Sequence, residues 1–300
     1  MSGKVMTMKE AVKKNVKSGD LLFIGGAQHG TPSAAVAEIV RQRINHLTLI
    51  SILANTTLLI GEGLVDKVLT GYAMTDERRS YALQRARTKY RVKVEFVEYS
   101  HFGIALALFA GYMGIPFMPT KSQIGSDMMK YNENIQSIDC PFIGGQIGAI
   151  RAVVPDVGIL HVQRCDAEGN AQKWGTLGVD HEGINASRKV IITTEKIVDS
   201  DVIRRDPNRT IIPGFRVNAI VEQPFGAYSG HLSGCYNDGP MGFGAMQDQE
   251  AWENYVKEAI YGVKDWNEYL ENLKKINGAD FLDRIKIKNP KFSEPIITGM

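Results

Sequence analysis

The chain has 300 residues, of which 44% are hydrophobic and 23% are charged, and its net charge is +2. It is long enough to bury a full hydrophobic core. The near balance of 35 basic and 33 acidic residues excludes the strongly basic surface that nucleic-acid and membrane-surface binders need. The three cysteines, Cys140, Cys165 and Cys235, include no CxxC pair, so the sequence indicates neither a disulfide framework nor a zinc site.

Segments that target or anchor a protein are not indicated by the sequence. Residues 1–16 mix apolar residues with lysines and lack the continuous apolar core of a signal peptide, and no run approaches the length of a membrane span. No two of the six histidines lie four residues apart on a predicted helix, so we expect no metal site. We expect a cytoplasmic protein with no nucleic-acid or membrane partner.

Helix and strand patterns alternate from the start of the chain. A capping box, with Thr7 as the cap and Glu10 three residues later, predicts a helix that ends near Val16. The apolar run at residues 21–24 predicts a buried strand, and a glycine loop at residues 25–30 follows it. Thr31 and Pro32 then have the pattern of an N-cap and a first helical residue, which predicts a helix over residues 33–43.

The same alternation continues to the C-terminus. Helices are predicted over residues 76–89 and 100–113, and strands over residues 47–53, 67–72, 92–97, 157–162, 190–194 and 216–221. Residues 117–118 are expected to be extended after the helix stop at Gly114. In the tail, aromatic residues at helical spacing predict two amphipathic helices within residues 247–277. These patterns predict an α/β layered fold with a mainly parallel sheet, as one domain over residues 1–300 with 247–277 packed on it as a helical extension.

The first candidate site is the glycine loop that follows the first strand. Gly25 and Gly26 permit positive φ and let backbone N–H groups approach a thioester or phosphate closely, while the helix after the loop favours negative charge at its N-terminus. The spacing matches neither the GxGxxG of a dinucleotide fold nor a P-loop. A tight turn without a ligand is the structural alternative.

The second candidate site spans residues 98–103, where a predicted strand ends and a helix begins. Ligands bind at such places in open α/β sheets, because side chains and helix N-termini converge there. His101 could donate a hydrogen bond to an oxyanion or act as an acid or base near neutral pH. The structural alternative is that His101 only caps the helix or fills a partly buried surface.

Other polar residues have simpler structural interpretations. We expect His161 to be a hydrogen-bonded core histidine and residues 166–170 to form an architectural turn. Glu195 with Lys196, and the pair Arg204 and Arg205, are expected on the solvated surface.

Taken in order, short segments along the whole chain resemble the α subunits of class I coenzyme A transferases, and most of all the α (A) subunit of glutaconate CoA-transferase. The segments are residues 4–11, 18–20, 25–26, 98–100, 114–117, 156–161, 169–170, 174–175, 204–207 and 212–214. The resemblance implies a Rossmann-like subunit that pairs with a β subunit, as a heterodimer, an α2β2 heterotetramer or a larger assembly. It also implies an active site at the interface, with a coenzyme A thioester as substrate and no permanently bound cofactor.

In that family, the nucleophile is a glutamate within a Ser-Glu-Asn-Gly motif, which forms an anhydride and then a glutamyl-CoA thioester. This chain has no such motif, and the segment around Glu133 lacks both its serine and its final glycine. The resemblance therefore implies that the nucleophilic glutamate lies on the partner β subunit.

Two residues depart from the family pattern. Ala27 follows the glycine pair where phenylalanine is usual, and His101 occupies the position of a glutamine that forms an oxyanion hole in the transferases and of a glutamate base in related ring-cleaving hydrolases. The resemblance implies catalytic roles for His101, Glu98 and Ser100. It implies substrate or coenzyme A contacts by Gly25, Gly26, Gln28, His29, Gly30, Phe102 and Gly103.

Three functions are consistent with the sequence. The first is one half of a CoA-transferase that acts on a carboxylic acid, including a glutaconate-like dicarboxylic acid. The second is a carbon–carbon cleaving CoA-ester hydrolase or a decarboxylase of the same superfamily, with His101 as the base. The third is a protein that only binds and regulates a partner, since the nucleophile is missing.

Overall fold

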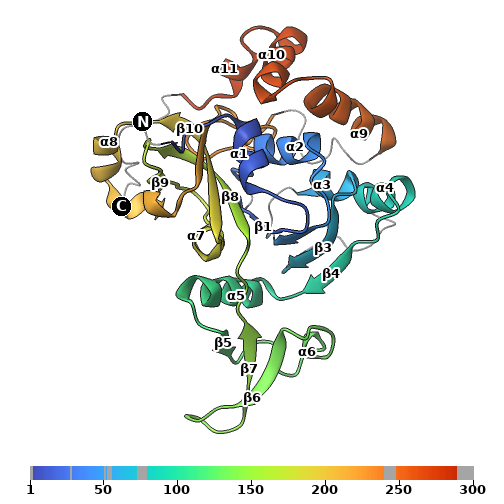
Figure 1. Ribbon diagram of the computed structural model, residues 1–300, viewed down its shortest axis with the longest axis vertical. Helices are drawn as coiled ribbons and strands as arrows, with labels where there is room; N and C mark the ends of the chain where they lie inside the picture. The colour runs from blue at the N-terminus through green and yellow to red at the C-terminus, as the bar shows by residue number, and fades with distance from the viewer. Residues whose placement is uncertain are drawn as a thin grey trace.

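A computed structural model describes residues 3–27, 29–50, 52, 56–72, 80–239 and 248–288. In this part of the chain, a large twisted sheet lies between helices on both of its faces, and a smaller sheet projects from one end of the molecule (Figure 1). This arrangement confirms the predicted α/β fold with a mainly parallel sheet.

Within the described residues, the large sheet has nine strands, seven of which form its parallel body. These seven lie in the order β12, β10, β8, β1, β2, β3, β4. Their bounds are β1 Leu21–Ile24, β2 Leu47–Ile50, β3 Val65–Thr70, β4 Glu95–Glu98, β8 Val157–Cys165, β10 Lys189–Ile197 and β12 Ala219–Glu222. Two short antiparallel strands, β9 Ala171–Gln172 and β11 Thr210–Ile212, extend the sheet beside the end of β8.

The chain order of the strands reverses direction between β1 and β8. From β1 the chain adds β2, β3 and β4 on one side, and it later returns to add β8, β10 and β12 on the other. In open parallel sheets, such a reversal opens a crevice at the carboxyl ends of the two central strands. The loop at residues 25–30 follows β1 and therefore lies at this switch point.

Alternating side chains of the strands feed two hydrophobic cores. Leu22 and Ile24 of β1 pack into the first core and Phe23 packs into the second, as the period of two in a strand requires. Helices α1 Met8–Asn15, α2 Ser33–Arg41, α3 Thr57–Gly61 and α4 Tyr81–Lys89 cover the first core. Helices α5 His101–Met113 and α7 Asp180–Ala186 cover the second. Burial on both faces explains why β1 is a continuous apolar run, whereas none of the four residues of the edge strand β4 is buried.

A three-stranded antiparallel sheet forms the projecting part of the molecule (Figure 1). It comprises β5 Phe117–Thr120, β6 Ile135–Asp139 and β7 Gln146–Arg151, with the short helix α6 Met128–Tyr131 between β5 and β6. The extended path at residues 117–118 is confirmed, but β6 and β7 are not predicted from the sequence. β6 buries only Ile135, so it lacks the apolar run that marks a buried strand. The short apolar run of β7 at residues 147–150 contains Gly148 and Ala149, which favour strands weakly.

The C-terminal helices pack on the first core through a buried carboxylate. Glu62 is fully buried and accepts hydrogen bonds from Arg85 Nε at 3.1 Å, Tyr90 OH at 2.7 Å and Trp252 Nε1 at 2.8 Å. Trp252 belongs to α9, so this carboxylate joins α3 and α4 to the tail. The tail contains α9 Gln249–Val256, the π-helical segment η4 Lys257–Tyr261, α10 Trp266–Asn277 and α11 Phe281–Ile285.

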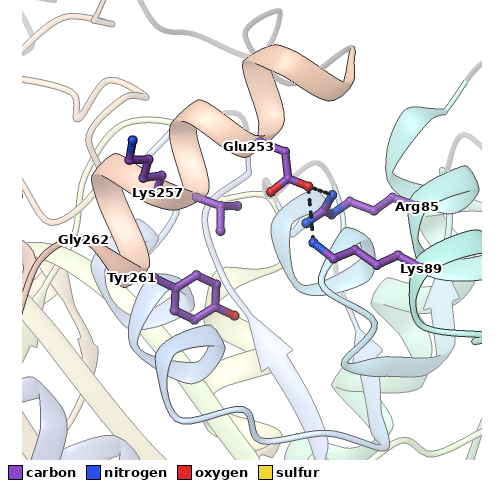
Figure 2. A pocket seen from close by; sticks show the side chains of 7 residues that line it. Arg85, Lys89, Glu253, Lys257, Tyr261 and Gly262 are labelled. Atoms are coloured by element: carbon purple, nitrogen blue, oxygen red, sulfur yellow. Dashed lines mark hydrogen bonds and ion pairs between the residues drawn. The ribbon is translucent and has the colours of Figure 1, made fainter.

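A cavity of about 310 Å³ lies where α4 meets α9 and η4. Two of the three cations that line it are engaged, since Arg85 and Lys89 both pair with Glu253 (Figure 2). Figure 2 also shows the amine of Lys257 on the side of the helix away from Arg85. Because the charged groups are paired or point apart, we interpret this cavity as a packing gap between helices.

Several predicted boundaries and one predicted environment need correction. The helix expected over residues 33–43 ends at Arg41, and its N-cap is Pro32 rather than Thr31. The helix expected from residue 76 is described from Tyr81, with Ser80 as its N-cap, and residues 73–79 lie outside the described residues. Glu195 is expected on the surface, but it is buried because three donors from other segments satisfy its carboxylate.

Other expectations are confirmed. His161 is fully buried, with its ring nitrogens 2.8 Å from Thr193 Oγ1 and 2.7 Å from Glu195 Oε1. Asp166 Oδ1 accepts from the backbone N–H groups of residues 168, 169 and 170, which closes the predicted turn. The short helices α8 Ser200–Arg204, η1 Pro207–Arg209 and η2 Gly214–Arg216 follow β10, and Arg204 and Arg205 are exposed.

Among the described helices, none is both long and apolar enough to cross a bilayer. A search of the same residues for three or more His, Cys, Asp or Glu side chains grouped around one metal position finds none.

Candidate functional site

The two predicted site segments lie at the same edge of the large sheet. The glycine loop follows β1 and residues 98–103 follow β4, and both strands belong to the parallel body, so their carboxyl ends share an edge. β2 and β3 separate them, which places the two segments roughly 14 Å apart at the usual strand spacing. Gln28, a predicted contact residue in the first segment, lies outside the described residues.

Packing against neighbouring segments requires both glycines of the pair. A Cβ at Gly25 would lie 2.4 Å from Leu160 Cδ1, and one at Gly26 would lie 2.6 Å from the backbone of Thr31. Gly26 also has φ +107°, a conformation that L side chains rarely adopt. The tight switch-point turn alone therefore accounts for the glycine pair.

The N–H groups of this loop already have acceptors within the chain. Gly25 N–H donates to Ile159 O at 3.0 Å, Gly26 N–H to Asp180 Oδ1 at 2.8 Å, and Gly30 N–H to His231 O at 2.9 Å. A ligand bound here would meet side chains and glycine Cα atoms rather than these three donors. These three hydrogen bonds hold Gly25, Gly26 and Gly30 in place.

A buried ion pair holds the loop in place. Lys173 Nζ lies 2.5 Å from Asp180 Oδ2, and both side chains are almost wholly buried. Asp180 is the first residue of α7, where the helix dipole favours a carboxylate. The other carboxylate oxygen of Asp180, Oδ1, accepts a hydrogen bond from Gly26 N–H. This one carboxylate therefore joins the loop after β1, helix α7 and the segment that follows β9. This pair is not predicted from the sequence, because nothing local marks a lysine for burial.

His29 lies beside this pair as a neutral, buried imidazole. Its Nε2 is 2.8 Å from Thr176 O, and its ring stacks on His231 with 5.6 Å between the centroids. Burial and, next, the positive charge of Lys173 lower the pKa of His29 to about 4. Because Nε2 donates to the carbonyl, Nδ1 is an acceptor, and that atom is buried with no hydrogen-bond partner.

The second segment presents its histidine at the start of a helix. Ser100 is the N-cap of α5, and its Oγ accepts from Gly103 N–H at 2.9 Å. His101 is the first helical residue and is exposed. It rests on Gly71, where a Cβ would come within 2.7 Å of His101 Cδ2, and its ring meets Tyr72 edge-on at 6.3 Å. The helix start and the close approach to Gly71 together fix the position of His101 at the end of β4.

The neighbours of His101 divide into exposed and buried residues. Glu98 and Phe102 are exposed, and Gly103 is buried. The carbonyl of Glu98 accepts from Asn132 Nδ2 at 2.8 Å, which ties the end of β4 to the segment after α6. The structure thus brings Glu98, Ser100, His101, Phe102 and Gly103 together as one group, separate from the glycine loop.

Gln123 is a residue of this group that the sequence does not predict. Its amide lies on Gly103, where a Cβ would be 2.3 Å from Gln123 Nε2. Its φ is +70°, and neither its Nε2 nor its Oε1 has a hydrogen-bond partner although both atoms are buried. A left-handed backbone and an unsatisfied amide each destabilise the fold, and such costs concentrate at functional sites. A lone glutamine in a loop gives no signal of this in the sequence.

In chemical terms, this edge offers hydrogen-bond donors and no nucleophile of the expected kind. An exposed imidazole at a helix N-terminus can donate to a developing oxyanion, because the helix end adds partial positive charge there. The chain contains no Ser-Glu-Asn-Gly motif. The described part of the edge can therefore stabilise an oxyanion.

Known proteins are similar to this chain in sequence and in fold. The model of the Coenzyme A transferase family matches residues 5–223. The chain is 33% identical over 273 residues to the A subunit of 3-oxoadipate CoA-transferase from Pseudomonas knackmussii, covering 88% of this chain and 96% of that protein. It is 31% identical to the A subunit of glutaconate CoA-transferase from Acidaminococcus fermentans, covering 95% of each. The crystal structure of glutaconate coenzyme A-transferase from Acidaminococcus fermentans superposes with a TM-score of 0.81 at 30% identity, over 95% of this chain and 96% of that one.

Proposed function

Because the chain belongs to the coenzyme A transferase family, as an α-type (A) subunit, we propose that it forms half of an active site that a separate β subunit completes. The β subunit supplies the nucleophilic glutamate, and this chain supplies His101 and the surrounding wall. One observation carries the proposal: His101 is exposed at the carboxyl edge of the sheet, in a chain that lacks the nucleophile motif.

His101 is proposed to act where negative charge develops. When the partner's glutamate attacks the thioester carbonyl, the carbonyl oxygen becomes an oxyanion, and the imidazole N–H donates to it. The thioester C–S bond then breaks to give an anhydride and coenzyme A thiolate. The thiolate attacks the glutamyl carbonyl of the anhydride, which releases the first carboxylate and leaves a glutamyl-CoA thioester.

The second half of the reaction runs these steps in reverse with a new carboxylate. That carboxylate attacks the glutamyl-CoA thioester, the released thiolate attacks the resulting anhydride, and the new acyl-CoA departs while the glutamate is restored. No water is consumed, so the site must exclude water from the covalent intermediate. The buried switch-point loop with Gly25, Gly26, His29 and Gly30 is proposed as the wall that does so.

A dicarboxylic acid is the proposed acyl group. The two relatives named above are described as acting on 3-oxoadipate and on glutaconate, and both compounds carry two carboxyl groups. Their identities of 33% and 31% to this chain support the substrate class rather than either compound.

The test is a coenzyme A exchange assay on the purified complex of this chain with its β subunit. Mass spectrometry follows transfer from acyl-CoA to a panel of mono- and dicarboxylic acids, and a thiol reagent measures released coenzyme A. Transfer to a dicarboxylate without thiol release supports the proposal. Thiol release without transfer supports the hydrolase or decarboxylase alternative, and no turnover supports a purely regulatory role.

Two variants of His101 separate its candidate roles. If His101 donates to an oxyanion, His101→Gln keeps a donor and retains most of the turnover, whereas His101→Ala loses on the order of 100-fold in kcat. If His101 is the base of a hydrolase, both variants lose turnover to the same extent, because glutamine cannot take a proton. Since His101 is exposed, neither variant is expected to change the stability of the free α subunit.

A further inference from the structure

The outer face of α5 carries apolar side chains that are exposed or half-buried. Residues 102, 105, 106, 109, 112 and 113 recur at intervals of three and four, so they lie along one side of the helix. Four of them are exposed, whereas Ala105 and Leu106 are half-buried and also pack against the second core. The exposed fractions of the larger ones are 58% for Phe102, 37% for Phe109, 40% for Tyr112 and 55% for Met113. We call these six residues the α5 stripe. It runs about 17 Å, the rise of the helix from residue 102 to residue 113.

This exposure is unusual for a surface helix. A helix on the outside of a protein normally turns charged or polar residues to water, but α5 has no charged residue from Phe102 to Met113. Its other face is already used, since Ile104, Ala107 and Leu108 are buried in the second core. The stripe is composed of phenylalanine, tyrosine, methionine, leucine and alanine. The aromatic residues and methionine are enriched in protein interfaces, from whose centres charged residues are depleted.

The apolar surface continues past the end of the helix. Ile115 and Phe117, which lead into β5, are also exposed, at 38% and 40%. At the other end, the stripe begins at Phe102, directly beside His101, and Tyr72 lies edge-on to that histidine. Exposed apolar residues therefore recur from the candidate catalytic residue to the small sheet.

We propose that the α5 stripe is the surface on which the β subunit docks. This inference rests on the proposed function, in which the nucleophilic glutamate comes from the β subunit. That glutamate must reach a thioester bound beside His101. Whatever covers the N-terminal end of the stripe therefore carries that glutamate. A second copy of this chain does not meet that requirement, because it also lacks the Ser-Glu-Asn-Gly motif.

The test measures the affinity of this chain for the purified β subunit, without any substrate. Met113→Glu places a charge in the stripe two turns or more from His101, and Phe109→Ser removes an aromatic anchor without adding charge. The matched control is Ile276→Glu on α10, where the side chain is 67% exposed and lies outside the stripe. We expect both stripe variants to raise the Kd at least about 30-fold, as loss of an interface anchor does, and the control to leave it unchanged.

Hydrogen exchange on the wild-type pair gives a second readout. Residues 101–113 should gain protection when the β subunit is added to this chain. The inference is overturned if Met113→Glu and Phe109→Ser bind the partner with the same affinity that Ile276→Glu shows. It is also overturned if the stripe proves to join two copies of this chain while the affinity for the β subunit is unchanged in the stripe variants.

Failure of this inference and failure of the proposed function are separable. If the stripe holds the β subunit in place but the complex transfers no coenzyme A, the docking surface stands and the proposed reaction fails. If the complex transfers coenzyme A and Met113→Glu does not lower the affinity for the β subunit, the proposed reaction stands and the docking surface lies elsewhere.

Discussion

Replacement of Asp180 by asparagine is expected to destabilise the free chain by about 3–5 kcal/mol, the usual cost of leaving one member of a buried ion pair without its partner. Lys173 is fully buried and 2.5 Å from Asp180 Oδ2, so its ammonium group loses its counter-charge in a place that water does not reach. The Gly26 N–H keeps an acceptor, because the amide oxygen of asparagine can occupy the position of Oδ1. The loss therefore reports mainly on the buried charge of Lys173.

A double variant separates charge from shape. When Lys173→Met is added to Asp180→Asn, no buried charge remains, and we expect the loss relative to wild type to shrink to about 1–2 kcal/mol. Urea denaturation followed by circular dichroism measures both values, and the slope should be unchanged if the fold is retained. A loss below about 1 kcal/mol in Asp180→Asn, or a double variant as unstable as the single one, would refute this account of the switch-point loop.

The same double variant has a spectroscopic consequence at His29. The charge of Lys173 helps to lower the pKa of His29 to about 4, so its removal should raise that pKa, although burial will still hold it below the ordinary value. NMR titration of the imidazole checks this directly. An unchanged pKa would mean that burial alone keeps His29 neutral.

Three further predictions concern stability. The pKa of His29 is lowered from 6.5 to about 4, so the neutral histidine stabilises the folded chain fully above pH 6.5. This stabilisation, up to about 3 kcal/mol, is lost as the pH falls through about 4. His29→Gln should therefore flatten the curve of unfolding free energy against pH between these two values. Glu62→Gln should cost about 3–5 kcal/mol in urea denaturation, because Arg85 loses its buried counter-charge, whereas the exposed control Glu258→Gln should change stability by less than about 0.5 kcal/mol. Gln123→Met replaces an unsatisfied buried amide with an apolar chain of similar length, so it should stabilise the protein by about 1 kcal/mol while lowering turnover of the complex; lower stability with full turnover would contradict a role at the site.

Local signals in the sequence are sufficient to predict the parallel sheet. The capping box of Thr7 and Glu10 forms as predicted, and the apolar runs within β1, β8 and β10 lie where these strands are buried. The residues at 98–103 are also predicted as a group, since a strand end followed by an N-cap serine is a local pattern. In these places, the information lies within a few neighbouring residues.

The remaining features depend on residues far apart in the chain. Glu195 resembles a surface residue in sequence, yet His161 and Tyr236 reach it from separate segments and satisfy its buried carboxylate. In the small sheet, β6 is not predicted because it buries only Ile135, and Gln123 is notable only because its amide lies on Gly103. The pairing of Lys173 with Asp180 is likewise visible only in three dimensions.

The central claim is that this chain holds half of a transferase site and that the covalent chemistry takes place on its partner. Incubation of the complex with acyl-CoA, followed by borohydride reduction and peptide mass spectrometry, tests it most directly. The account predicts a reduced glutamate on the β subunit, none on this chain, and loss of that product when His101 is replaced by alanine. Reduction of a carboxylate on this chain, such as Glu98, or turnover with no covalent intermediate on either partner, would contradict it.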